Sequence, residues 1–248
     1  IDKILTLKRE HDAVHNQLRV LVTSGGDPSR LIDEINETKD ETDLKHFHKV
    51  GRVKHAKKAV ELGADGVIAA GYEMGAHTHQ PDEAVHTFVL VPQIAEAVDV
   101  PVVAAGGVKD GRSLLAALSL GAEGVSMGTR FLTTQESDFA EEYKEFIVEA
   151  GEGSDRVLGQ GRPLRAMKSP ALQEYAERIQ DIGMDEFTEL EEDKALTAQN
   201  SGNVEEGIVW SGQIGCYIDD LPSVADVIDD IITEATDRYA DLGDRITI

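Results

Sequence analysis

Cysteine is almost absent from this sequence of 248 residues, and long apolar runs are missing altogether. Cys216 stands alone, which excludes an intramolecular disulfide, so nothing indicates an oxidising compartment. No stretch approaches the roughly 20 apolar residues of a membrane-spanning helix, and the first residues are charged rather than signal-like. We therefore expect a soluble, cytoplasmic protein.

Basic residues are also scarce. The sequence has 24 lysines and arginines against 47 acidic residues, which gives a net charge of -23. Nucleic acids and anionic membranes are excluded as partners by this balance, because their phosphates would be repelled. The acidic residues are dispersed, which favours a halophilic source, since salt screens the self-repulsion of such a surface. A merely acidic protein from an ordinary source is the alternative.

The dinucleotide fingerprint G-x-G-x-x-G after a first strand is absent, but short apolar runs alternate with amphipathic segments. This βα repeat predicts an α/β fold of the TIM (β/α)8 type with a parallel sheet. Strands are expected at residues 18–23, 46–50, 65–70, 100–105 and 124–128. Because a closed barrel of this type has eight strands, we expect the N-terminal strands to be missing from this sequence or to lie on another chain.

After Ser137 the pattern changes, which predicts a domain boundary there. Residues 1–137 are expected to form the partial barrel and residues 138–248 a mainly helical C-terminal segment. Helices are expected at 138–150, 170–182 and 221–239, with a loop over 159–169.

Glycine turns end the last two expected strands, Gly106-Gly107 after one and Gly128-Thr129 after the other. Glycines expose bare N–H groups, and the loops after the last two strands of a (β/α)8 barrel are the usual phosphate site. These turns therefore indicate a phosphate cradle. The alternative is that the glycines only permit tight strand-to-helix turns. In either case Asp110 or Ser113 is expected to cap the helix that follows.

Histidines follow or occupy two of the expected strands. His77 comes after the strand at 65–70, where such folds keep catalytic residues, and an imidazole can accept or donate a proton near neutral pH. A loop histidine with a structural hydrogen bond is the alternative. The pairs His46/His48 and His77/His79 have the spacing of zinc ligands, but no carboxylate or lysine at the expected strand ends completes a metal site.

Several segments together resemble one family. These segments are GADGVIAAGYEMGAHTH, AAGGVKDGRSLLAALSLGAEGVSMGTRFLTTQES, GRPLRAMKS and WSGQIGCYIDDLPS. They are similar to the nitronate monooxygenases, formerly called 2-nitropropane dioxygenases, whose relatives include the FMN-dependent enoyl-acyl-carrier-protein reductases. The resemblance covers about residues 18–235.

The resemblance implies FMN as the cofactor and His77 as the catalytic base. It also implies that the loop 210–215 returns to the mouth of the barrel. Ala70 and Ala76 depart from the family pattern, which has glutamine and glycine at these two positions. The residues implied to bind FMN are Gly75, Gly106, Gly107, Ser126, Met127, Gly128, Thr129 and Gln213.

The implied reaction is the oxidation of an alkyl nitronate by molecular oxygen to a carbonyl compound and nitrite. Two other readings stay open: an enoyl-acyl-carrier-protein reductase that uses NAD(P)H, and a degenerate flavin-binding member without activity. In each case the expected partner is a small molecule, and assembly into a homo-oligomer stays open.

Overall fold

The computed structural model describes residues 2–25, 28–159, 163–178 and 182–245. The chain divides into two compact units. The first unit consists of residues 1–71, 85–105 and 117–125, and the second of residues 72–84, 106–116 and 126–248.

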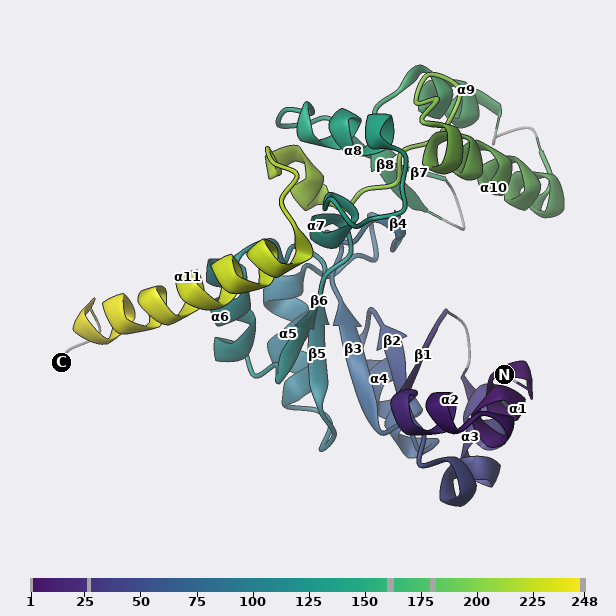
Figure 1. The fold of residues 1–248 in the computed structure, drawn as a ribbon, viewed down its shortest axis with the longest axis vertical. Coiled ribbons are helices and arrows are strands. Elements are labelled where there is room, and N and C mark those ends of the chain that lie inside the picture. The colour runs from purple at the N-terminus through teal and green to yellow at the C-terminus, as the bar shows by residue number, and fades with distance from the viewer. Residues whose placement is uncertain (1, 26–27, 160–162, 179–181, 246–248) are drawn as a thin grey trace. The chain divides into compact units, whose positions relative to one another are not determined.

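The first unit is built on a five-stranded sheet in the order β1-β2-β3-β5-β6 (Figure 1). Pairing is parallel from β1 through β5, with Thr23 opposite His48 and Val67 opposite Val102. The α/β class with a parallel sheet of the (β/α) type is thereby confirmed, and the five strands are those expected from their apolar runs. Their bounds are β1 Val20–Ser24, β2 Lys45–Val50, β3 Gly66–Ala70, β5 Val102–Ala105 and β6 Gly124–Ser126.

Helices alternate with these strands, as the βα repeat predicts. The main core packs apolar strand residues such as Val67 and Val102 against Leu90, Val91 and Ile94 of α5. In the part of the chain that the structure describes, no helix is long and apolar enough to cross a membrane. The helix bounds are α1 Asp2–Glu10, α2 Asp12–Gln17, α3 Ser29–Thr42, α4 Val53–Glu61, α5 Thr87–Ala95 and α6 Gly111–Ser119, the last of which begins in the second unit.

The N-terminal helical segment is interrupted at His11, whose backbone is extended, so that α1 and α2 are separate. Lys8 of α1 is fully buried, and its ammonium donates to the carbonyl oxygens of His15 and Leu18, both at 2.7 Å. These bonds hold α1 against the end of α2, which a periodicity argument does not reveal.

His46 and His48 lie on β2 and are buried. Nε2 of His46 and Nδ1 of His48 contact Oγ1 of Thr23 on β1, at 2.6 and 2.8 Å. The two imidazoles therefore bind a neighbouring strand.

The second unit contains a three-stranded antiparallel sheet in the order β4-β8-β7. Its strands are β4 Ala76–His77, β7 Asp155–Leu158 and β8 Leu164–Met167. The expected loop over 159–169 is thus wrong for residues 164–167. Arg165 explains why this segment is ordered: its guanidinium pairs with Asp155, donates to the Tyr72 carbonyl at 3.0 Å and lies 4.8 Å from the centre of the Tyr72 ring. Arg162 of the same segment lies outside the described residues.

Helices make up much of the rest of the second unit. Two apolar clusters stabilise it, one around Tyr143 and Ile147 of α8 and the other around Leu164 and Tyr175. The bounds are α7 Thr129–Leu132, α8 Glu141–Val148, α9 Pro170–Arg178, α10 Met184–Ser201, the 3-10 helix η1 Gln213–Tyr217 and α11 Val224–Arg245.

Candidate active site

Every residue that the sequence assigned to the site lies in the second unit. These residues belong to the loop 73–77, the turn 106–107, the segment 126–129 and the loop 211–213. The contacts described next all lie within this unit.

The loop 73–77 is packed tightly against the loop 211–213. Gln213 N–H donates to the Glu73 carbonyl oxygen at 2.9 Å. A Cβ atom added to Gly75 would lie 2.4 Å from the nitrogen of Gly212 and 2.5 Å from the carbonyl carbon of Ser211. Position 75 therefore requires glycine because two backbones meet there.

The turn after β5 uses backbone angles that favour glycine. The φ angles of Gly106 and Gly107 are +87° and +77°, and a Cβ on Gly107 would be 3.6 Å from the side chain of Glu73. The turn therefore runs beside the segment that leads to His77.

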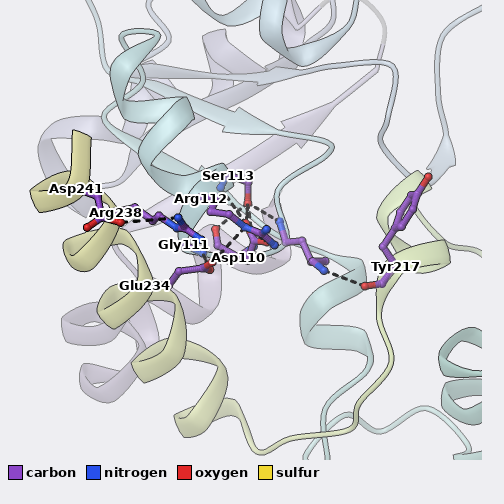
Figure 2. Close-up of polar contacts among 9 residues, drawn as sticks. Asp110, Gly111, Arg112, Ser113, Tyr217, Glu234, Arg238 and Asp241 are labelled. Carbon is purple, nitrogen blue, oxygen red and sulfur yellow. Dashed lines mark hydrogen bonds and ion pairs between the residues drawn. The ribbon is translucent and has the colours of Figure 1, made fainter. Parts of the chain in front are cut away.

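The beginning of α6 is capped by Asp110 and Ser113, as expected. Ser113 N–H donates to Oδ1 of Asp110 at 3.0 Å, and Oγ of Ser113 accepts from the N–H groups of Lys109 and Asp110 at 2.9 Å (Figure 2). Gly111 N–H donates to Oε2 of Glu234, which ties this turn to α11. Burial by itself would raise the pKa of Asp110, but the hydrogen bonds from Ser113 and Arg112 outweigh it and lower that pKa.

The turn after β6 is open above Gly128. A Cβ added there would have nothing within 4 Å, and the residue has φ -101°. Thr129 is buried, and its Oγ1 accepts a hydrogen bond of 2.8 Å from Gly212 N–H. Its hydroxyl hydrogen can still be donated to a ligand. Ser126, at the end of β6, is exposed, and Met127 is half-buried.

The C-terminal loop 211–213 therefore connects two predicted parts of the site. Gly212 contacts the segment 126–129 through Thr129, and Gln213 contacts the loop 73–77 through Glu73. Gln213 acts here through its backbone N–H, and its side chain is exposed at the first position of η1.

His77 lies on β4, opposite Leu164 of β8. Its side chain is 41% exposed, and Nε2 lies 2.9 Å from Oε1 of Glu191, whose side chain is only 3% exposed. The two atoms are at ion-pair distance, although their angle falls outside hydrogen-bond geometry. The ring of Trp210 lies 6.3 Å from that of His77, centre to centre. A half-exposed imidazole is thus held beside a buried carboxylate.

Ala76 precedes His77 with φ +54°, in the left-handed region. Glycine is the residue that the family pattern has at this position, and an alanine there is strained. The departure noted in the sequence therefore places a strained backbone next to the candidate base.

Glu191 was missed by the sequence reasoning. A signal for it exists: Glu191, Ala195 and Ala198 have the i, i+4, i+7 spacing of one helix face, and all three are buried. A glutamate in the apolar stripe of a helix indicates a specific partner.

These features define a candidate anion-binding site with an acid–base group. They are the glycine turns that follow β5 and β6, the open space at Gly128, and the histidine beside a buried glutamate. Comparison with known proteins then identifies the family. The sequence model of the nitronate monooxygenases (Nitronate monooxygenase, NMO) matches residues 8–234, so the chain belongs to this family.

Curated relatives have two different names. The chain is 34% identical over 234 residues to (3aS,4S,5R,7aS)-5-hydroxy-7a-methyl-1-oxo-octahydro-1H-indene-4-carboxyl-CoA dehydrogenase of Rhodococcus jostii, covering 78% of this chain and 65% of that protein. It is 33% identical over 234 residues to a probable nitronate monooxygenase of Staphylococcus saprophyticus, covering 88% of this chain and 63% of the relative. The chain thus spans less than two thirds of the length of these relatives.

A solved structure supports the fold class. FabK from Thermotoga maritima superposes with a TM-score of 0.86 at 33% identity, over 99% of this chain and 75% of that chain.

Proposed function

We propose that the protein is an FMN-dependent oxidoreductase that oxidises alkyl nitronates with molecular oxygen to a carbonyl compound and nitrite. The observation that carries this proposal is membership of the nitronate monooxygenase family, together with the grouping of all the implied site residues in one unit.

The residues present fit the phosphate of FMN. Gly128 has open space where a Cβ would be, the turn at Gly106 and Gly107 has positive φ angles, and the Thr129 hydroxyl keeps a hydrogen to donate. The same residues and Gly75 would hold the cofactor. When bound, a flavin supplies the electron transfer between substrate and oxygen, and the protein supplies binding, orientation and a base.

His77 is proposed to remove the α-proton when the substrate is the neutral nitroalkane. An imidazole suits this step because it accepts a proton near neutral pH. The nitronate is already deprotonated, so its oxidation does not need this step. Substitution of His77 should therefore affect the two substrates differently.

The test compares His77→Ala with the parent protein after loading with FMN. Turnover of the neutral nitroalkane, followed as nitrite release, should fall by roughly 10²–10⁴-fold, the usual effect of a positioned base. Turnover of the nitronate should fall much less. Equal losses would indicate anion binding or orientation by His77, and unchanged rates with full flavin occupancy would refute the assignment.

Flavin identity has its own test. Gly128→Asp places a carboxylate where the phosphate is proposed to bind, so the variant should lose FMN, measured by absorbance after gel filtration. Full flavin occupancy in this variant would contradict the proposed phosphate site. A colourless parent protein that cannot be reconstituted would instead support the non-catalytic alternative.

A second candidate is oxidoreduction of an acyl thioester. The relative from Rhodococcus jostii is named as a carboxyl-CoA dehydrogenase, and the enoyl-acyl-carrier-protein reductase alternative also concerns a thioester. An enoyl-CoA substrate with NAD(P)H distinguishes the candidates: NAD(P)H oxidation without nitrite formation from nitronates would favour the thioester enzyme.

We also propose that the protein is adapted to high salt and lies in the cytoplasm. Its acidic surface is proposed to be an adaptation to high salt, and the free, buried Cys216 suits a reducing cytoplasm. Thermal unfolding at several salt concentrations and cell fractionation test these two points.

A further inference from the structure

Glu191 is a buried carboxylate whose place in the fold is not explained by packing. It lies on α10 with a side chain 3% exposed, on the same helix face as Ala195 and Ala198. An apolar residue there would avoid the desolvation penalty of an ionised group. The glutamate therefore needs a partner that compensates for its burial.

His77 is the partner that the geometry provides, with its Nε2 2.9 Å from Oε1 of Glu191. Two of the described cations on the neighbouring elements have other partners. Arg165 on β8 pairs with Asp155, and Lys194 on α10 lies 3.5 Å from Glu174 on α9. The negative charge of Glu191 is thus directed at the imidazole.

Apolar groups lie beside this pair on its buried side. Leu190, the neighbour of Glu191 on α10, belongs to the same cluster as Leu164 and Trp210, and the Trp210 ring contacts His77. A charge interaction in such surroundings is stronger than at the surface, because water screens it less.

We propose that Glu191 is a positioning residue for His77, a role that rests on the proposed function of His77 as the base. The negative charge of the carboxylate, 2.9 Å from Nε2, favours the neutral tautomer of the imidazole with its proton on Nε2. Nδ1 is then the nitrogen with a free lone pair, directed away from Glu191. This is the arrangement in which a base is oriented by a third group.

The proton transfer follows from this tautomer. The C–H bond at the α-carbon of the nitroalkane breaks, and an N–H bond forms at Nδ1 of His77. The electron pair of the C–H bond stays on the substrate and is delocalised into the nitro group, which gives the nitronate. The imidazole gains one positive charge, and the carboxylate of Glu191 stabilises it.

Kinetics of two variants and a matched control test the proposal. Glu191→Gln keeps a hydrogen-bond acceptor but removes the charge, and Glu191→Leu removes both. Glu192→Gln makes the same chemical change at the next, exposed position of α10. With FMN-loaded protein, kcat/KM for the neutral nitroalkane should fall by about 10-fold in Glu191→Gln and about 10²-fold or more in Glu191→Leu. Glu192→Gln should match the parent, and all three variants should oxidise the nitronate within about 3-fold of it.

The tautomer itself has a spectroscopic signature. Nitrogen-15 NMR of histidine-labelled protein distinguishes a ring nitrogen that carries a proton from one that does not, and His77→Ala identifies the signals of His77. The parent and Glu191→Gln should show a protonated Nε2, and Glu191→Leu a mixture of tautomers. The same signals from Glu191→Leu as from the parent would overturn the proposal.

Stability separates positioning from a structural role. Because Glu191 is buried at an apolar position, Glu191→Leu should melt at the parent's temperature or higher while its nitroalkane activity falls. A fall in melting temperature together with equal losses of activity on the nitroalkane and the nitronate would overturn the proposal. If Glu191→Leu does not fold, Glu191→Gln gives the kinetic result, because it keeps the shape of the side chain.

The experiments distinguish a failure of the proposed role of His77 from a failure of the proposed role of Glu191. If His77→Ala turns over the nitroalkane normally, His77 is not the base, and both proposals fail. If His77→Ala loses this activity while both Glu191 variants behave like Glu192→Gln, only the positioning role is wrong.

Discussion

Gly75→Ala is the substitution whose effect follows most directly from the geometry of the site. The added methyl group would lie 2.4 Å from the Gly212 nitrogen, 2.5 Å from the Ser211 carbonyl carbon and 2.9 Å from the Ser211 carbonyl oxygen. Ordinary contacts of a carbon atom are about 3.5–4.0 Å. Because the obstructing atoms belong to backbone, a change of rotamer cannot relieve the overlap, and the two loops must separate by about 1 Å.

Overpacking of this kind destabilises a protein by typically 1–3 kcal/mol. In a chain of this length each kcal/mol lowers the melting temperature by about 2–4 °C. Since both loops resist movement, we expect the upper half of the range, a fall of roughly 5–10 °C without flavin. The loop shift should also weaken FMN binding, because Gly212 holds the Thr129 hydroxyl.

Thermal unfolding with and without FMN measures both effects, and Gly128→Ala is the matched control. Its methyl group would meet nothing within 4 Å, and φ -101° suits alanine, so without flavin it should melt within about 1 °C of the parent. With FMN the parent should gain stability, about 2.7 kcal/mol at a ligand concentration of 100 times Kd, and Gly128→Ala should gain less. A flavin-free Gly75→Ala that melts with the parent would refute the close approach of the two loops.

Four further predictions concern stability and reactivity. Asp110→Asn should lower the melting temperature at pH 7, because the folded-state pKa of Asp110 is lowered and its ionised form stabilises the fold. The difference from the parent should shrink as the pH falls below about 4 and vanish below that lowered pKa. A difference that does not depend on pH would contradict this. Burial, followed by the charge of Asp155, raises the pKa of the Cys216 thiol, so iodoacetamide at pH 7.5 should label it slowly in the folded protein and fast in urea. Added salt that shortens the Debye length from about 30 to 3 Å should raise the melting temperature, and a flat or falling response would remove the halophilic interpretation. Ala76→Gly should melt at or above the parent's temperature, because relief of a left-handed alanine offsets the usual loss of about 0.5–1 kcal/mol for glycine; a fall of about 2–4 °C would contradict the strain.

The parallel sheet could be predicted because its strands are short, uniformly apolar runs. Val67 to Ala70 is buried at every position, as expected for a strand covered on both faces, and the glycines after β5 mark where it ends. These signals are local, so one sequence is enough to read them.

The antiparallel sheet could not be predicted from the same signals. β7 and β8 have only four residues each, one of them an arginine, and β4 has two residues. Their order depends on contacts between distant segments, such as Arg165 with Tyr72. Such strand pairing overrides local propensity, so the periodicity of apolar residues in the sequence does not predict it.

The same limit applies to the candidate site. His77 and the glycine turns were identified from position and family resemblance, because each stands at the end of a recognisable strand. The partner of His77 comes from α10, an acidic helix whose single buried carboxylate is hidden among exposed ones. Burial distinguishes Glu191 from Glu192, and burial depends on the tertiary structure.

The loop 211–213 explains how residues far apart in sequence become one site. Gly212 can donate to Thr129 and lie against Gly75 only because neither glycine has a side chain at the contact. Tyr143 fixes the preceding residue, since its hydroxyl donates to the Trp210 carbonyl oxygen at 2.8 Å. Trp210 in turn contacts the ring of His77. A displacement of this loop would therefore move the proposed phosphate turn and the proposed base together, so a substitution in it should change cofactor affinity and turnover in parallel, whereas Glu191→Gln should change turnover alone.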